Sequence, residues 1–160
     1  MAKRILVVDD ELDARELVDA VLTAWGAAVV SVGSAVEALA EMERQPFDVL
    51  ISDIGMPVMD GYDLISKIRQ LPEECGGRIP AAALTAYAGI EDCKRALSAG
   101  YQIHVPKPVE PDELTAVVAT LAGRVNTGSI NDVGVDQLLH TTEETSDERI
   151  NNTKTKHEFC

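Results

Sequence analysis

Short runs of consecutive aliphatic residues alternate along the chain with longer stretches in which hydrophobic residues recur every three or four positions. A continuous aliphatic run bounded by polar residues predicts a strand that is buried on both faces. The runs lie at Ile5–Val8, Ala28–Val32, Val49–Ile51, Ala81–Thr85 and Ile103–Val105. Because a helical pattern follows each run, the sequence predicts five βα units and an α/β fold.

The predicted helices begin and end at residues with known terminal preferences. Hydrophobic residues at helical spacing lead up to Gly26, which predicts a helix C-terminus there. Ser34 and Glu37 have the spacing of a capping box and open a helix expected to run through Arg44. Further helices are expected at Tyr62–Gln70, at Asp92–Ala99 and from Pro111 onward, with Leu71–Pro80 as a loop.

Strict alternation of strands and helices predicts a doubly wound parallel sheet with helices on both faces, because parallel strands need crossover connections. Right-handed crossovers leave few topologies for such a chain. In open sheets of this kind the functional site lies beyond the carboxyl ends of the strands. Polar residues at those ends are therefore the candidates for chemistry.

The alternating pattern stops near Ala122, so we expect one domain at residues 1–122 and a polar, acidic tail at residues 123–160. Val135, Leu138 and Leu139 would support at most one short helix in a tail that is otherwise mostly disordered. The tail is too short for an ordinary DNA-binding output domain and lacks a basic face.

Composition narrows the classes of partner. A formal net charge of −13 argues against a nucleic-acid surface, and acidic side chains suit Mg²⁺ or a basic protein partner. The alternative is that the charge only keeps the protein soluble. Three scattered cysteines favour neither a zinc site nor a disulfide framework, and no apolar stretch is long enough to span a membrane. The expected location is the cytoplasm.

Three acidic residues follow predicted strands that are neighbours in a doubly wound sheet. Asp9 and Asp10 come directly after the first strand, and Asp53 ends the third. Carboxylates this close repel one another unless a cation lies between them, and Mg²⁺ accepts such ligands together with a carbonyl and waters. Taken singly, Asp9 and Asp10 could instead cap the first helix, and Asp53 could be an ordinary loop acid.

Two more strand ends carry groups that suit phosphoryl transfer. Thr85 closes the fourth strand, and Lys107 follows the fifth. A carboxylate can act as the nucleophile while a metal ion and an ammonium neutralise the phosphoryl oxygens and a hydroxyl donates a hydrogen bond. A lone threonine is usually structural, and a lone lysine is usually solvated. Suitable groups at four separate strand ends, however, are not expected to occur together by chance.

The chain resembles response-regulator receiver domains over residues 3–122. The resemblance is carried by four motifs in the family's order and spacing: Ile5-Leu6-Val7-Val8-Asp9-Asp10-Glu11, Asp53-Ile54-Gly55-Met56-Pro57-Val58-Met59-Asp60-Gly61, Leu84-Thr85-Ala86, and Ala99-Gly100 followed by Lys107-Pro108. It implies a flavodoxin-like five-stranded sheet in the order 2-1-3-4-5. It also implies a phosphoacceptor signalling domain that is not an enzyme beyond its own phosphorylation and dephosphorylation.

The resemblance also implies a role for each matching residue. Asp53 would be the phosphorylated aspartate, with Thr85 and Lys107 in contact with the phosphoryl group. Asp10, Asp53 and the backbone carbonyl of Gly55 would bind Mg²⁺ directly. Asp9 would bind it through water. The peptide bond before the proline of the Lys-Pro pair would be cis.

One position departs from the commonest family pattern. His104 stands where many members have Tyr or Phe, a side chain that turns inward when Thr85 moves toward the phosphate. His104 would then belong to the switch together with Thr85. The alternative is an ordinary, half-exposed histidine on a strand.

The partners implied by the resemblance are a histidine kinase or a histidine phosphotransfer domain, and a downstream protein target; a homodimer is left open. Met1 lies just before the first strand, as in a free-standing regulator, and the alternative is a receiver within a hybrid histidine kinase. A haloacid-dehalogenase enzyme would need a second aspartate where Gly55 stands. A flavin-binding protein would need hydroxyls and free amides where the first loop is acidic.

Overall fold

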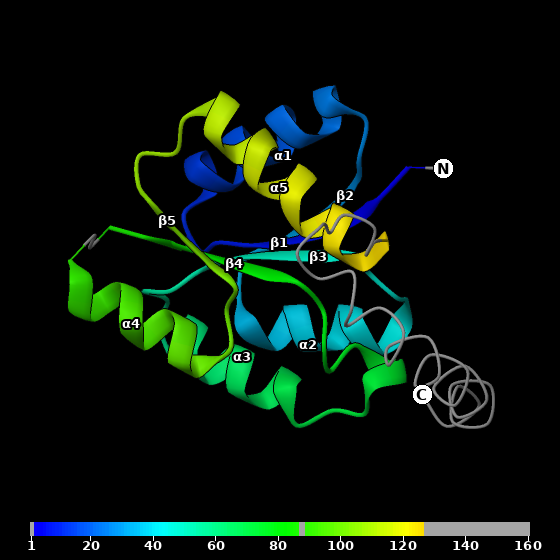
Figure 1. Cartoon of the computed structure of the whole chain (residues 1–160), viewed down its shortest axis with the longest axis vertical. Coiled ribbons are helices and arrows are strands. Elements are labelled where there is room, and N and C mark those ends of the chain that lie inside the picture. The colour runs from blue at the N-terminus through cyan, green and yellow to red at the C-terminus, as the bar shows by residue number, and fades with distance from the viewer. Residues whose placement is uncertain (1, 87–88, 127–160) are drawn as a thin grey trace, which may run out of the picture.

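The computed structural model describes residues 2–86 and 89–126, and it contains five strands and five α-helices in strict alternation (Figure 1). In chain order, the elements are β1 (Arg4–Val8), α1 (Leu12–Trp25), β2 (Ala28–Val32), α2 (Ala35–Arg44), β3 (Val49–Asp53), α3 (Gly61–Arg69), the 3-10 helix η1 (Glu73–Cys75), β4 (Ala81–Thr85), α4 (Ile90–Ala99), β5 (Ile103–Pro106) and α5 (Pro111–Asn126).

All strand pairs are parallel, and the sheet order is β2-β1-β3-β4-β5. This confirms the expected doubly wound, flavodoxin-like topology, in which the strand order reverses between β1 and β3. Helices α1 and α5 cover one face of the sheet, and α2, α3 and α4 cover the other (Figure 1). Right-handed crossovers produce this two-sided layering.

Two hydrophobic cores lie on the two faces of the sheet. Along β1, alternate residues enter opposite cores: Leu6 and Val8 pack toward α2 and α3, and Ile5 and Val7 pack toward α1 and α5. Every residue of β3 is buried, up to and including Asp53. The central position of β3 therefore places the Asp53 carboxylate at the end of a strand that is buried along its whole length.

The helix ends follow the predicted signals. The Ser34 hydroxyl accepts a hydrogen bond from the Glu37 amide at 3.2 Å, as a capping residue should. Gly26 and Gly100 end α1 and α4 with φ values of 109° and 132°, which favour glycine because a residue with a Cβ is strained at positive φ. These local signals set the length of each crossover.

Some boundaries differ from the sequence prediction. Helix α4 begins at Ile90 rather than Asp92, and the loop at residues 71–80 contains the 3-10 helix η1. The last helix runs to Asn126, past the boundary expected at residue 122. Cys93 of α4 is a free cysteine. The hydrophobic residues of the predicted tail helix lie outside the described residues.

Candidate functional site

The sheet register brings the chemically active strand ends to one edge. Asp9 follows β1, Asp53 ends β3, Thr85 ends β4, and Lys107 follows β5. Adjacent strands end almost level with one another, as shown by the paired residues Val8 and Ser52, Asp53 and Leu84, and Thr85 and Pro106. The four predicted strand-end residues therefore lie around the carboxyl edge of the sheet.

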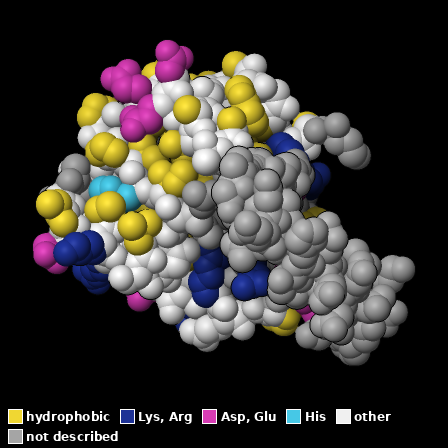
Figure 2. Space-filling view, viewed as in Figure 1, with side chains coloured by type: hydrophobic (Ala, Val, Ile, Leu, Met, Phe, Trp, Pro, Cys, Tyr) yellow, Lys and Arg dark blue, Asp and Glu magenta, His cyan; other side chains and the backbone are white. Residues whose placement is uncertain are grey.

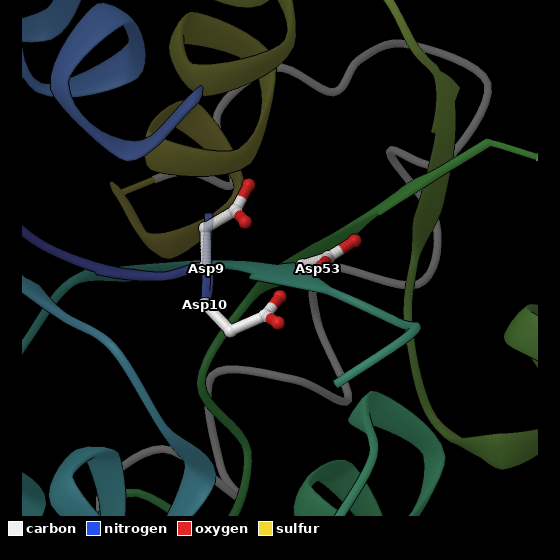
Figure 3. Close-up of side chains that lie close together, drawn as sticks. All are labelled: Asp9, Asp10 and Asp53. Atoms are coloured by element: carbon white, nitrogen blue, oxygen red, sulfur yellow. The ribbon is translucent and has the colours of Figure 1, made fainter. Parts of the chain in front are cut away.

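Asp9, Asp10 and Asp53 form one carboxylate cluster, with an oxygen of each within 4.8 Å of the others. Figure 3 shows the three side chains projecting from the ends of β1 and β3 into the same space. Asp9 and Asp53 are buried, whereas Asp10 is exposed. Neither Asp9 nor Asp10 is the N-cap of α1, which is Glu11, although the Asp9 carboxylate accepts a hydrogen bond from the Glu11 amide at 2.9 Å.

Lys107 reaches two of the three carboxylates. Its Nζ lies 3.1 Å from an Asp53 oxygen and 3.2 Å from an Asp9 oxygen. The Lys107 amide also donates to the Thr85 carbonyl at 2.8 Å, and the Lys107-Pro108 peptide bond is cis. The strand end of β4 thus holds the main chain of Lys107 while the lysine side chain extends over the acidic cluster.

The environment of Asp53 disfavours its charged form. Burial raises the pKa of Asp53 to about 6, helped by the negative charge of Asp9, although Lys107 lowers it. For Lys107, burial acts to lower the pKa, but the carboxylates of Asp53 and Asp9 outweigh burial and raise it. The lysine is therefore positively charged at neutral pH, and the ionised form of Asp53 is disfavoured by its surroundings.

The donor set fits a hard divalent cation. Carboxylate oxygens from three aspartates converge, Asp10 is open to solvent, and Gly55 lies exposed on the loop that follows Asp53. Such oxygen ligands, with places left for water, are what Mg²⁺ binds in proteins. A cation among these carboxylates would also offset the repulsion that raises the pKa of Asp53.

The loop between β3 and α3 contains a feature that the sequence analysis missed. Val58 has a φ of 69°, a left-handed conformation that is unfavourable for a β-branched residue, and its side chain is fully exposed. Nearby, the Met59 amide donates to the Pro57 carbonyl at 2.7 Å, and the Gly61 amide donates to the Ile54 carbonyl at 2.8 Å. The loop is thus folded tightly back against the end of β3.

His104 lies on β5 beside Ala83 of β4, and paired residues of parallel strands point to the same face. Ala83 belongs to the core under α2, α3 and α4, so His104 faces that side of the sheet. The side chain is half-buried, and its Nε2 atom is buried without a hydrogen-bond partner among the described residues. His104 is thus next to β4 but is not part of the carboxylate cluster.

The sequence model of the response regulator receiver domain family matches residues 5–119. The chain belongs to this family. An uncharacterized 14.6 kDa protein of Leptolyngbya boryana is 46% identical over 114 residues, which are 71% of this chain and 86% of that protein. The sensor histidine kinase RcsC of Salmonella typhi is 37% identical over 121 residues, which are 76% of this chain but only 12% of the kinase.

Solved receiver structures share the fold. A CheY-like receiver domain protein from Methanospirillum hungatei superimposes with a TM-score of 0.70 at 29% identity, over 78% of this chain and 96% of that one. The receiver domain of sensor histidine kinase PA1611 from Pseudomonas aeruginosa gives a TM-score of 0.70 at 32% identity, over 77% and 99% of the chains. That structure contains a magnesium ion in its active-site cleft.

These comparisons identify the chain as a receiver domain of two-component signalling. Within residues 2–86 and 89–126, no helix has the length and apolar character needed to cross a membrane.

Proposed function

We propose that Asp53 accepts a phosphoryl group from the phosphohistidine of a histidine kinase or a histidine phosphotransfer domain. The observation that carries this proposal is the position of Asp53 at the sheet edge, with a carboxylate oxygen 3.1 Å from the Lys107 ammonium and close to Asp9 and Asp10. At neutral pH an acid with a pKa of about 6 is mostly ionised, so the nucleophile is available.

The residues around Asp53 have distinct roles in the proposed reaction. An Asp53 oxygen attacks phosphorus as the phosphorus–nitrogen bond to histidine breaks, and the imidazole nitrogen leaves with the bonding electron pair. The Lys107 ammonium, now shared between two carboxylates, pairs with a phosphoryl oxygen, and the Thr85 hydroxyl approaches another. Hydrolysis of the acyl phosphate later restores the carboxylate.

Mg²⁺ is the proposed metal cofactor. Asp10, Asp53 and the Gly55 carbonyl would bind it directly, and Asp9 would bind it through water. When bound, the ion supplies positive charge that offsets the repulsion between the phosphoryl oxygens and the carboxylates. The exposed position of Asp10 suits a ligand that must meet the metal from solvent, and the buried position of Asp9 suits a supporting role.

Incubation with acetyl phosphate and Mg²⁺ tests the acceptor. Mass spectrometry should show one added phosphoryl group that is stable to acid and labile to base, as an acyl phosphate is. Asp53→Asn should abolish it, whereas Glu16→Gln, which removes an exposed carboxylate of α1, should not. Labelling of Asp53→Asn at the parent rate would show that another residue is the acceptor.

We further propose that phosphorylation changes the surface formed by α4, β5 and α5, where a downstream protein would bind. Hydrophobic side chains gather on this surface (Figure 2), and Ile90 and Leu97 of α4 are 74% and 46% exposed. Movement of Thr85 toward the phosphoryl group would open space beside β4, and His104 would fill it. A free-energy difference of a few kcal/mol between the two packing arrangements is enough for such a switch.

NMR spectra with and without beryllofluoride, a phosphoryl mimic, test the role of His104. His104→Ala should leave Asp53 phosphorylation nearly unchanged and should reduce the shifts that beryllofluoride induces across α4, β5 and α5. Parent-sized shifts over that surface in the variant would show that His104 is an ordinary strand residue.

A second setting is a receiver within a hybrid histidine kinase. The match to 12% of RcsC and the likeness to the receiver of PA1611 favour it. The phosphoacceptor chemistry would be the same, but the donor would be a phosphohistidine of the same polypeptide. The length of the parent gene distinguishes a hybrid kinase from a free-standing regulator.

A further inference from the structure

Tyr101, in the turn between α4 and β5, places a hydroxyl group inside the protein. The residue is 3% exposed, and its hydroxyl donates a 2.7 Å hydrogen bond to the carbonyl of Gly61, the first residue of α3. Burial raises the pKa of Tyr101, so the hydroxyl keeps its proton and acts as a donor. The bond joins two segments that are 40 residues apart.

Gly61 in turn lies against the main chain of Asp53. A Cβ atom at Gly61 would come within 2.5 Å of the Asp53 carbonyl oxygen and within 2.8 Å of the Ile54 Cα, so only glycine fits. The Gly61 amide also donates to the Ile54 carbonyl at 2.8 Å, which closes the loop that contains Gly55. The position of Gly61 therefore sets the position of that loop.

Ser52 provides a second connection between Tyr101 and Asp53. Its side chain is fully buried, and its hydroxyl donates to the Asp53 carbonyl at 2.9 Å. The Ser52 hydroxyl also lies near the Tyr101 hydroxyl. Two groups, Gly61 and Ser52, thus contact the peptide of Asp53, and the Tyr101 hydroxyl binds Gly61 and lies near Ser52.

Tyr101 is itself held firmly. Its amide donates to the Ala96 carbonyl at 3.1 Å at the end of α4. The preceding carbonyl, of Gly100, accepts two hydrogen bonds from the Arg69 guanidinium, at 2.7 and 3.1 Å. These bonds anchor the main chain of Tyr101, which restricts where its buried hydroxyl can lie.

We propose that Tyr101 is a positioning residue for the receiver site. Its hydroxyl holds the start of α3 against the Asp53 peptide, and so fixes the Gly55 carbonyl and the Asp53 carboxylate where Mg²⁺ and the phosphoryl group need them. This role rests on the proposed function of Asp53. It adds a residue that touches neither the metal nor the phosphoryl group.

Tyr101→Phe removes the hydroxyl and keeps the ring in the core. One net hydrogen bond corresponds to a factor of about 2 to 12 in an equilibrium. We therefore expect the Mg²⁺ dissociation constant, measured by calorimetric titration, to rise by a factor in that range. The rate constant for phosphorylation by acetyl phosphate at saturating Mg²⁺ should fall several-fold. Tyr62→Phe is the matched control, because Tyr62 lies on α3 with its ring stacked on Arg95.

Ser52→Ala provides an independent variant. It should change both quantities in the same direction, and the double variant should lose less than the product of the two single effects, because the two hydroxyls lie near each other. Amide NMR shifts between Ser52 and Gly55 should change in both variants and stay unchanged in Tyr62→Phe.

A purely structural role would give a different result. Tyr101→Phe would then unfold more easily, but the folded variant would keep the parent Mg²⁺ dissociation constant and the parent rate constant at saturating Mg²⁺, and the inference would be overturned. If the parent protein accepted no phosphoryl group, the proposed function would fail instead. The Mg²⁺ titration and the amide shifts would still decide the role of Tyr101.

Discussion

Asp53→Asn should stabilise the protein at neutral pH in the absence of divalent cations. Burial and the neighbouring Asp9 raise the pKa of Asp53 from 3.8 to about 6, so the folded state binds this proton more tightly than the unfolded state does. The stability that protonated Asp53 provides is fully present below pH 3.8 and is lost as the pH rises through about 6. Asparagine resembles the protonated acid at every pH.

The size of the effect follows from the pKa shift. A shift of about two units, at about 1.4 kcal/mol per unit, corresponds to about 3 kcal/mol of unfolding free energy above the folded-state pKa. Asp53 is only 6% exposed, so solvent screening reduces this figure little. The variant should therefore be about 3 kcal/mol more stable than the parent near pH 8 and about equally stable near pH 4.

Urea unfolding in EDTA, followed by circular dichroism at several pH values, measures this difference. Glu16→Gln is the control, because it makes the same change in net charge at an exposed site on α1 and should give a difference that varies little with pH. A pH-independent difference between Asp53→Asn and the parent would refute the reasoning. So would a parent that is the more stable protein near pH 8. Mg²⁺ should reduce the difference, since it neutralises the ionised cluster.

Three further predictions concern the metal, the C-terminal segment and the strained loop. Millimolar Mg²⁺ should raise the melting temperature of the parent, and Asp10→Ala should remove that gain; a parent indifferent to Mg²⁺ would contradict the metal site. A chain ending at Asn126 should fold and be phosphorylated like the full chain, and aggregation or a much lower melting temperature would show that residues 127–160 contribute to the fold. Val58→Asn should stabilise the protein by about 1 kcal/mol, because asparagine tolerates positive φ better than valine does. Val36→Asn, an exposed valine in the regular helix α2, should give no gain, and an equal gain there would show that backbone strain is not the cause.

The sequence alone determined the fold class and the order of its parts. Five aliphatic runs separated by helical patterns leave few arrangements other than a doubly wound sheet, because crossover connections are right-handed and strands buried on both faces need helices on both sides. Local signals were equally reliable at Ser34, Gly26 and Gly100, since capping depends on a few neighbouring residues. The same holds for the strand ends at which Asp53 and Thr85 lie.

The sequence also identified the set of residues at the candidate site, because the carboxyl ends of parallel strands meet at one edge. What it left open was how these residues differ. Asp9 and Asp10 are adjacent in sequence, yet one is fully buried and paired with Lys107 and the other is exposed. The difference in burial and pairing between Asp9 and Asp10 depends on the direction in which each side chain points at the end of β1.

Only the tertiary structure revealed contacts between distant segments. The bond from Lys107 to Asp9 spans 98 positions, and the raised pKa of Asp53 reflects burial together with the charges of Asp9 and Asp10, which follow a different strand. In the sequence, Tyr101 is one aromatic residue after a helix-ending glycine, with no local pattern to mark its hydroxyl. Its bond to Gly61 exists because the packing of α3 and α4 brings the two segments together. Local propensities and periodicity thus determine which elements form, while long-range packing decides which polar groups meet and how strongly each is perturbed.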